Sequence, residues 1–256
     1  MATREKIKLT SYNELLGVNN DMISEIDINK LHQFKDHPFS VVDNEKMLEL
    51  AKSIENNGIL SPLLVRPLGD GEYEIISGHR RKRACEITGK KKVSAIIKDI
   101  SHEEAIPLMV DANFQREDTL PSEKAKAYKM KMEALAHQGK SSDEMSSAKK
   151  IGQLAGISDR QVQRYIRLTE LIPELSKLVD DKQITFVLGV EISFLKTEYQ
   201  QLIYENICKG KKVSKDNVRM IRENQENLSL EEVSQILFAD KAKIQKKICN
   251  VTLKEN

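Results

Sequence analysis

Hydrophobic residues in the first half of the chain alternate between the period of a helix and the period of a strand. An apolar stripe of helical period occupies residues 43–58, between a capping Asp or Asn and a terminating Gly. Two β-rich runs follow at 59–68 and 72–78, and the Gly-Asp-Gly between them is a hairpin signal. A basic segment at 79–89 is a further helix, and 93–100 is a third strand. This order predicts a compact domain in which helices pack on strands.

From Ser101 to the end of the chain the pattern is helical throughout. Ser101 with Glu104, and Ser229 with Glu232, form two capping boxes, and each marks the start of a helix. We therefore expect an α+β fold class, in which a small mixed N-terminal α/β domain is followed by helices alone.

The spacing of small and apolar residues in 149–168 (KKIGQLAGISDRQVQRYIRL) is typical of a helix-turn-helix. Gly152 is small where the second helix must approach the first, and Gly156 can supply the positive φ of the tight turn. Ser158 or Asp159 then caps the second helix. The alternative is an ordinary αα-corner with a solvated polar face, because such spacing also occurs outside DNA-binding proteins.

The apolar residues Val162, Tyr165 and Ile166 of the second helix are expected to face inward. Long hydrogen-bond donors are then left on the outer face. Arg can bind guanine and Gln can bind adenine through two hydrogen bonds each, and a helix N-terminus suits phosphate. The predicted DNA-binding residues are Ser158, Arg160, Gln161, Gln163, Arg164 and Arg167.

Composition limits the classes of function. The 256 residues carry 41 Lys+Arg and 39 Asp+Glu, a net charge of +2, so nucleic-acid binding must come from local clusters of charge. Three widely spaced cysteines argue against a disulfide framework or a zinc site and fit a reducing compartment. We expect a cytoplasmic protein with no membrane partner, because no signal peptide and no apolar window of ~20 residues is present.

A run of basic residues at 79–83 directly follows a Ser-Gly turn. Cations at the start of a helix oppose its dipole, so the run favours a bound anion. Arg80 and Arg83 share a face, Arg81 projects to the side, and the free N–H groups of the first turn suit phosphate. The alternative is that Arg81 and Arg83 pair with the acidic residues of DNEKMLE or SHEE.

No enzymatic motif accompanies this basic run. The sequence contains no P-loop, no G-x-S-x-G and no Cys–His nucleophile pair, and its five histidines lack metal-ligand spacing. These observations favour a binding protein over an enzyme.

Four segments in order resemble the ParB family of chromosome- and plasmid-partition proteins, over roughly 37–200. ENNGILSPLLVRP resembles the strand entry of the family, SGHRRKRA its G-E-R-R-x-R-A box, and DANFQREDTLPSEKAKAY its E-N-x-Q-R-x-x-L-x-P-x-E-x-A segment. The helix-turn-helix stands where the family has one. Four ordered motifs make a chance match improbable.

The resemblance implies a protein that binds a centromere-like DNA site, binds CTP with Mg²⁺ in its N-terminal domain, and closes as a homodimeric clamp on DNA. It also implies slow CTP hydrolysis, a ParA-type ATPase partner, and a location on the nucleoid or a plasmid. By this resemblance Asn113 helps to hold Mg²⁺. The implied nucleotide-binding residues are Ser61, Pro62, Gly78, His79, Arg80, Arg81, Arg83 and Asn113.

Two residues depart from the family pattern. His79 stands where the family usually has Glu, and Ala112 stands where it usually has the Glu that precedes Asn113. A hard cation prefers oxygen ligands, and both carboxylates are missing here. We therefore expect nucleotide binding with at most a weak CTPase activity.

The expected organisation has four segments. These are a flexible N-terminal tail with a ParA-type partner segment at 1–36, a ParB-like nucleotide-binding domain at 37–118, a helix-turn-helix DNA-binding domain at 119–200, and a C-terminal helical segment at 201–256. The last segment is amphipathic, so it either dimerises or packs on its own domain.

The leading hypothesis is a sequence-specific DNA-binding protein of plasmid or chromosome segregation, in which CTP binding gates a dimeric DNA clamp. The alternative is a site-specific transcription regulator of a mobile element that has no nucleotide dependence. A third hypothesis is an enzyme, because relatives of the N-terminal fold include a nucleotide-dependent serine kinase and sulfiredoxin. No general base stands beside the basic run, and Cys85 lies inside a helix, so this third hypothesis has the least support.

Overall fold

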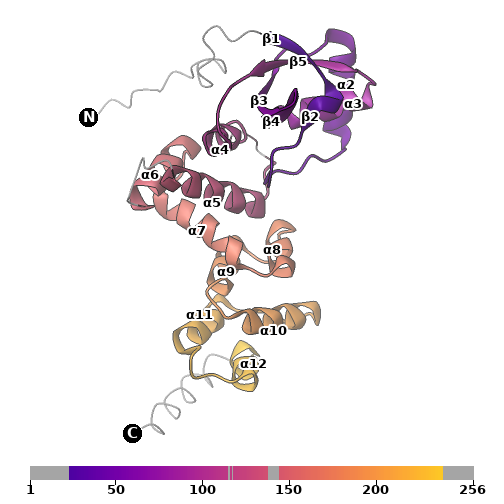
Figure 1. Cartoon of the computed structure of the whole chain (residues 1–256). Helices are drawn as coiled ribbons and strands as arrows, with labels where there is room; N and C mark the ends of the chain where they lie inside the picture. Colours follow the sequence, from indigo (N-terminus) through magenta and orange to yellow (C-terminus); the bar gives the residue numbers. More distant parts are fainter. Residues whose placement is uncertain (1–22, 115, 117, 138–143, 239–256) are drawn as a thin grey trace, which may run out of the picture. The chain divides into compact units, whose positions relative to one another are not determined.

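The computed structural model describes residues 23–114, 116, 118–137 and 144–238 (Figure 1). Residues 1–22, which make up most of the expected N-terminal tail and partner segment, lie outside the described residues, as do residues 239–256. Within the described part of the chain, no helix is both long and apolar enough to span a bilayer.

The chain divides into two compact units. The N-terminal unit comprises the described residues of 1–117 and 130–147, and the C-terminal unit comprises those of 118–129 and 148–256. The division falls inside helices α5 (Pro121–His137) and α6 (Glu144–Ala155), so each of these helices contributes to both units.

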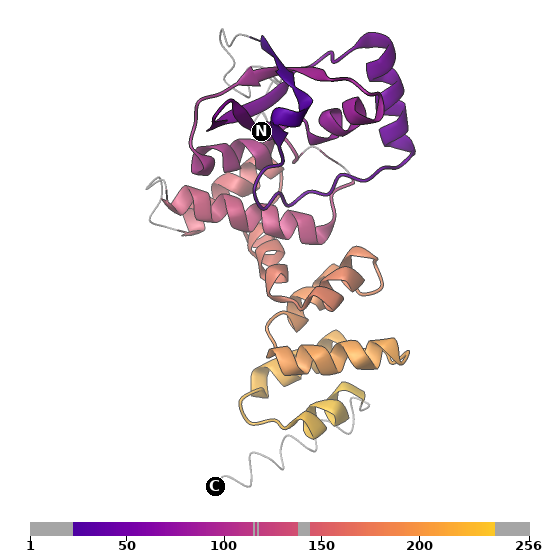
Figure 2. The same ribbon diagram turned by 45° about the vertical axis from the view of Figure 1, so that its right-hand side comes forward.

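A five-stranded mixed sheet forms the centre of the N-terminal unit (Figure 2). Its strands lie in the order β1-β5-β3-β4-β2. The pairs β1/β5 and β3/β4 are antiparallel, whereas β5/β3 and β4/β2 are parallel. The strands are β1 (Ile23–Asp27), β2 (Leu31–His32), β3 (Leu63–Gly69), β4 (Glu72–Ser77) and β5 (Lys92–Ile97).

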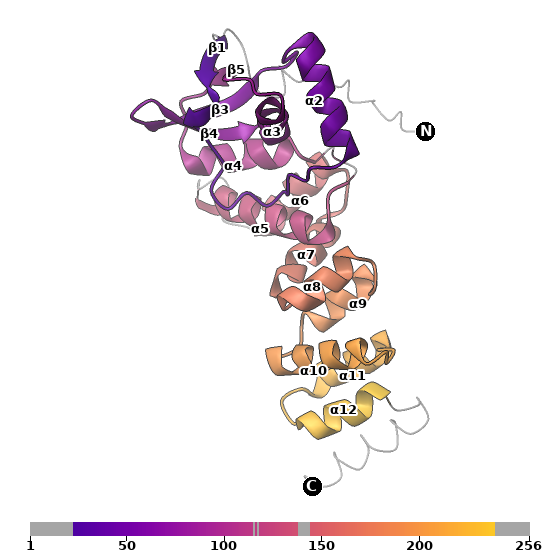
Figure 3. The same cartoon turned by 90° about the vertical axis from the view of Figure 1, so that its right-hand side faces the viewer.

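Helices α2 (Glu45–Asn57) and α3 (His79–Ile87) lie side by side (Figure 3). Met47 of α2, Ala84 of α3 and Ile75 of β4 are fully buried in one core, which ties both helices to the sheet. Helix α4 (His102–Asp111) contacts β4. Because α3 starts two residues after β4 ends, this core fixes the position of the basic first turn.

The predicted α+β fold class is confirmed, and so are the predicted helices and strands between residues 43 and 111. The Gly-Asp-Gly hairpin is confirmed as well, because Gly69, Asp70 and Gly71 all have positive φ between β3 and β4. The capping boxes at Ser101 and Ser229 are both present.

Residues 23–36 differ from the flexible tail that is expected from sequence at 1–36. They contain β1, the 3-10 helix η1 (Ile28–Lys30) and β2. The apolar residues here stand at positions 23, 26, 28, 31 and 34, without the period of two that indicates a strand, but Ile26 and Leu31 are 5% and 3% exposed. The strand β1 forms only by pairing with β5, about 69 residues later in the chain, and such a distant partner leaves no local signal.

The C-terminal unit is helical. It contains parts of α5 and α6, then α7 (Asp159–Arg167), the 3-10 helix η2 (Leu168–Glu170), α8 (Pro173–Asp180), α9 (Phe186–Ile192), α10 (Thr197–Cys208), α11 (Lys215–Asn224) and α12 (Leu230–Phe238). One hydrophobic core runs through these helices, with Leu175, Ile192 and Ile203 fully buried.

The last described helix packs on its own unit. Val233 and Leu237 of α12 are 0% and 1% exposed in the same core. Asn217 of α11 donates from Nδ2 to the backbone carbonyls of Ile236 and Leu237, at 2.9 and 3.0 Å. Of the two expected roles of the C-terminal segment, packing on its own domain therefore holds for residues 230–238.

Candidate functional site

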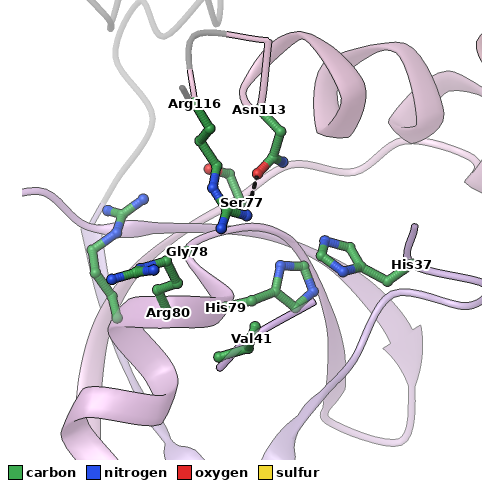
Figure 4. A pocket seen from close by; sticks show the side chains of 9 residues that line it. His37, Val41, Ser77, Gly78, His79, Arg80, Asn113 and Arg116 are labelled. Carbon is green, nitrogen blue, oxygen red and sulfur yellow. Dashed lines mark hydrogen bonds between the residues drawn. The ribbon is translucent and has the colours of Figure 1, made fainter. Parts of the chain in front are cut away.

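A cavity of about 160 Å³ lies at the N-terminus of α3 (Figure 4). By the same measure of volume, one water molecule needs only ~10–15 Å³, so this cavity has room for several waters or for a larger group. Three segments of the N-terminal unit enclose it: the loop before α2, the β4–α3 turn, and the turn after α4. The lining residues are His37, Val41, Ser77, Gly78, His79, Arg80, Arg81, Asn113 and Arg116.

Gly78 shapes the turn that opens this cavity. Its φ of 111° lies in the region that side chains rarely adopt, and a Cβ added there would lie 2.7 Å from Cγ of Leu63. Gly78 is also the N-cap of α3, and no side chain caps the helix. The first N–H groups of α3 are therefore available to an anion in the cavity.

Three guanidinium groups line the cavity, those of Arg80, Arg81 and Arg116. Among the described residues that line it, none is an aspartate or glutamate. Arg80 has no hydrogen bond or ion pair with any described residue. The cavity is therefore a concentration of positive charge that a bound anion would neutralise.

Ser61 and Pro62 meet the site through their backbone. Nη1 of Arg81 donates to the carbonyl oxygens of Ser61 and Pro62, the latter at 2.6 Å. The sequence predicts that Arg81 projects to the side. In the structure its guanidinium instead joins the cavity to the loop before β3.

Arg83 lies apart from the other predicted phosphate contacts. Its Nη2 donates to Oδ2 of Asp43 at 2.5 Å and its Nη1 to Glu86 at 3.2 Å. The hydrogen bond from Arg83 lowers the pKa of Asp43, and the same contact raises the pKa of Arg83. The sequence left this pairing open as the alternative for Arg83, and the structure shows it. The predicted role of Arg83 in nucleotide binding has no support from this geometry.

His79 is a neutral donor at the cavity wall. Burial, followed by the charges of His37, Lys82 and Arg116, lowers the pKa of His79 to about 3. Its Nε2 lies 3.4 Å from the backbone N of Phe34, which can only donate. This contact assigns the proton of the neutral ring to Nδ1. The ring also packs against His37, with 3.8 Å between the ring centroids.

The lining does not fit a magnesium ion held by the protein. Mg²⁺ requires near-octahedral oxygen ligands at ~2.0–2.1 Å. Among the described lining residues, only Ser77 and Asn113 carry a side-chain oxygen. Oδ1 of Asn113 accepts a hydrogen bond from Nη1 of Arg116 at 3.4 Å, so a positive charge already faces the amide oxygen that a metal would need. No group of three His, Cys, Asp or Glu residues suited to a metal occurs in the described chain.

A buried ion pair supports the turn that carries Asn113 and Arg116. Lys131, only 2% exposed, pairs through Nζ with Oδ1 of Asp111, and its Nζ also lies 5.1 Å from the ring centroid of Phe114. Burial is the main cause that raises the pKa of Asp111 and lowers that of Lys131. The pair thus holds the end of α4 against the second half of α5.

Several residues that line the cavity are not among the predicted site residues. Arg116 stands in the motif DANFQRED, so its basic character and its place in the motif were a usable signal. Ser77 was noted only as part of the turn. For His37 and Val41 the sequence offers no signal, because a loop far from the motif brings them to the site.

Helices α6 and α7 form the predicted helix-turn-helix. A Cβ at Gly152 would lie 2.6 Å from the carbonyl oxygen of Ile157, so only glycine allows this close approach. Gly156 has φ of 69°, and the hydroxyl of Ser158 accepts from the N–H of Gln161 at 3.2 Å. Val162 of α7 is fully buried. These local predictions are confirmed.

The predicted DNA-binding residues on and next to α7 differ in their exposure. Ser158, Arg160 and Gln163 are exposed, and Gln161 and Arg164 are half-buried. Arg167 is different, because its Nη2 donates to the carbonyl of Ser193 at 2.6 Å. Its guanidinium also lies 4.3 Å from the ring centroid of Phe194. Arg167 is thus bound within the C-terminal unit and not on the exposed face.

The chain matches one family model and many known proteins. The model of the ParB N-terminal domain matches residues 13–114. A nucleoid occlusion protein from Oceanobacillus iheyensis is 30% identical over 213 residues, which cover 81% of this chain and 71% of that protein. The chromosome-partitioning protein Spo0J from Thermus thermophilus is 39% identical over 141 residues, or 55% of this chain. The chain spans about half of this second relative, because the match covers 48% of it.

A solved structure shows the same fold. The pNOB8-like ParB N-domain has a TM-score of 0.51 and 17% sequence identity, with 89% of this chain and 97% of that chain covered. At this identity the likeness concerns the fold alone.

Proposed function

The chain belongs to the ParB family of partition proteins, and from this premise we propose that it binds a centromere-like site in double-stranded DNA and uses CTP to gate a dimeric clamp. Helices α6 and α7 bind the DNA in this proposal. The cavity at the start of α3 binds the nucleotide, and two copies of the chain close around the duplex. The process served is the segregation of a chromosome or plasmid.

One observation carries the nucleotide part of the proposal. Three guanidiniums and the uncapped N-terminus of α3 surround one cavity, and no described carboxylate lines it. Hydrogen bonds between guanidinium and phosphate are roughly twice as strong as those between neutral groups. The free N–H groups of α3 add further donors for the same anion. A polyphosphate is the ligand that uses all of these groups together.

The DNA part of the proposal rests on α7. The recognition helix of a helix-turn-helix reads base edges with residues near its N-terminus. Arg160 and Gln163 are exposed there, and Ser158 lies at the helix start, where phosphate is favoured. A single exposed arginine that binds guanine through two hydrogen bonds contributes ~1–3 kcal/mol of discrimination.

Hydrolysis of CTP is weak or absent in this proposal. The described lining residues include no carboxylate that could act as a general base, and burial lowers the pKa of His79 to about 3, which makes its imidazole a weak base. CTP then acts by being bound, and its exchange resets the clamp.

The experiment that tests the gate is a crosslinking assay of two protomers. Cysteines are introduced at exposed positions of the N-terminal unit, and crosslinking is compared with CTP, with cognate DNA, with both, and with neither. We expect the greatest crosslinking with both ligands. Equal crosslinking in all four conditions would contradict a nucleotide-gated clamp.

A transcription regulator without nucleotide dependence is the second candidate. It predicts firm DNA binding, with a steep salt dependence, that CTP does not alter. Calorimetric titration of the protein with CTP separates the two functions, because the regulator would produce no heat of binding.

A further inference from the structure

The cavity at α3 is rich in hydrogen-bond donors. Arg80, Arg81 and Arg116 present guanidinium N–H groups, and the first turn of α3 presents backbone N–H groups. Among the described lining residues, the acceptors are the side-chain oxygens of Ser77 and Asn113, the unprotonated ring nitrogens of the two histidines, and the backbone carbonyls. Nδ1 of His37 donates to a backbone carbonyl at 2.7 Å, which leaves Nε2 of that ring as an acceptor. A donor-rich wall matches phosphate oxygens directly.

His79 adds one more hydrogen-bond donor to the cavity wall. An N–H group has no lone pair with which to bind a metal ion. Nε2 of His79 faces the backbone N–H of Phe34, so the proton lies on Nδ1. No described residue forms a hydrogen bond with that Nδ1. The ring therefore presents a neutral N–H group at the cavity wall, in the first position of α3.

A divalent cation would be poorly accommodated beside this lining. Three guanidiniums would repel it, and Oδ1 of Asn113 already accepts from Arg116 at 3.4 Å. The charge of a polyphosphate can instead be neutralised by the guanidiniums themselves, which form paired hydrogen bonds with phosphate oxygens.

We propose that this cavity binds the phosphate groups of its nucleotide directly, without a divalent cation, and that His79 sets this preference by donating Nδ1–H to a phosphate oxygen. The inference rests on the proposed CTP binding and specifies its ligand as a metal-free polyphosphate. His79 is then a specificity-determining residue of the cavity.

The test is calorimetric titration of the full chain with CTP, once with Mg²⁺ and once with EDTA, at equal ionic strength. We expect dissociation constants within ~3-fold of each other, a difference below ~1 kcal/mol by RT ln Kd. A loss of more than ~10-fold in EDTA would overturn the inference and leave the proposed function standing. The absence of CTP binding in both buffers would instead overturn the proposed function.

Two substitutions test the role of His79. His79→Glu places a carboxylate beside the phosphates, so we expect affinity in EDTA to fall more than ~10-fold and Mg²⁺ to restore most of it. His79→Gln is the matched control, because it keeps a neutral N–H donor and should bind equally in both buffers. If His79→Glu binds CTP in EDTA as well as the unaltered chain does, His79 does not set the preference.

A competition experiment covers the case in which His79→Glu does not fold. Inorganic tripolyphosphate is added to the unaltered chain and CTP in EDTA. We expect it to displace CTP, since the cavity binds phosphate groups without metal. Failure to displace CTP at saturating concentrations would show that the phosphates are not held in this way.

Discussion

Nη2 of Arg83 lies 2.5 Å from Oδ2 of Asp43, although Arg83 stands only three residues after Arg80, which lines the cavity. The two side chains of the pair are 43% and 48% exposed, so the pair contributes little to stability. The ion pair instead holds the Arg83 side chain on Asp43. One arginine of the basic run is engaged by the protein, and another is left for a ligand.

Arg80→Ala should therefore weaken CTP binding, whereas Arg83→Ala should not. The loss of a charged hydrogen bond costs ~1.5–3 kcal/mol, so we expect affinity to fall about 10- to 100-fold in Arg80→Ala. Titration calorimetry measures both variants under one set of conditions. Equal losses in the two would show that Arg83 leaves Asp43 to reach the ligand.

Gly78→Ala should unfold more readily and lose CTP binding. Alanine would combine an unfavourable φ of 111° with a contact of 2.7 Å to Leu63, so we expect a loss of at least ~2 kcal/mol in the free energy of unfolding. Gly89→Ala is the control, because Gly89 has φ of 67° but nothing within 4 Å of its added Cβ. It should lose only about 1 kcal/mol in urea unfolding. Gly89→Ala should also keep its CTP affinity. If both variants lose a similar amount of free energy of unfolding, the contact with Leu63 does not contribute to the effect.

Lys131→Met should destabilise the protein through Asp111. The substitution leaves a carboxylate with 25% of its side chain exposed and no cation beside it, at a cost of ~3 kcal/mol. Adding Asp111→Asn to Lys131→Met should recover part of this loss. Chemical denaturation of the two single variants and the double variant gives the coupling energy. If the losses in the free energy of unfolding of the two single variants simply add in the double variant, the ion pair does not cause the destabilisation.

The stability of the protein should fall as the pH falls below 6.5, in part because of His79. The pKa of His79 is about 3 in the folded protein and 6.5 in an unfolded chain, so between these pH values the unfolded state binds more protons. One proton that only the unfolded state binds costs about 1.36 kcal/mol of stability per pH unit. Protonation of His79 therefore lowers the free energy of unfolding by about 2 kcal/mol between pH 7 and pH 5. His79→Gln should show a correspondingly smaller change in urea unfolding over that range. An unchanged pH dependence would mean that His79 is protonated in the fold.

Arg160→Ala and Arg167→Ala should act on different properties. Arg160 is exposed on α7, so its loss should weaken cognate DNA binding by ~1–3 kcal/mol without lowering the melting temperature. Arg167 is bound to Ser193 and packs on Phe194, so its loss should lower the melting temperature. Fluorescence anisotropy with labelled DNA and thermal unfolding measure the two effects. A lower melting temperature in Arg160→Ala would contradict its assignment to the exposed face.

Much of the site could be anticipated from sequence where a single turn of chain defines it. Gly78 before a basic helix and Gly156 between two helices require particular backbone angles at known positions, so local pattern reveals them. Arg167 could not be placed in this way. It occurs in the same polar run as Arg160, and only the packing of α9 against α7 brings Ser193 to it.

The helices, the central strands, the hairpin, the capping residues and the two basic elements could be predicted from sequence, because period, capping and turn chemistry act over a few residues. Which cations remain open to a ligand, and which nitrogen of His79 carries the proton, depend instead on how distant parts of the chain pack. Asp43 and Arg83 are 40 residues apart, and Phe34 and His79 are 45 apart. Charges and protons respond to neighbours in space, and those neighbours exist only once the sheet and its helices have packed.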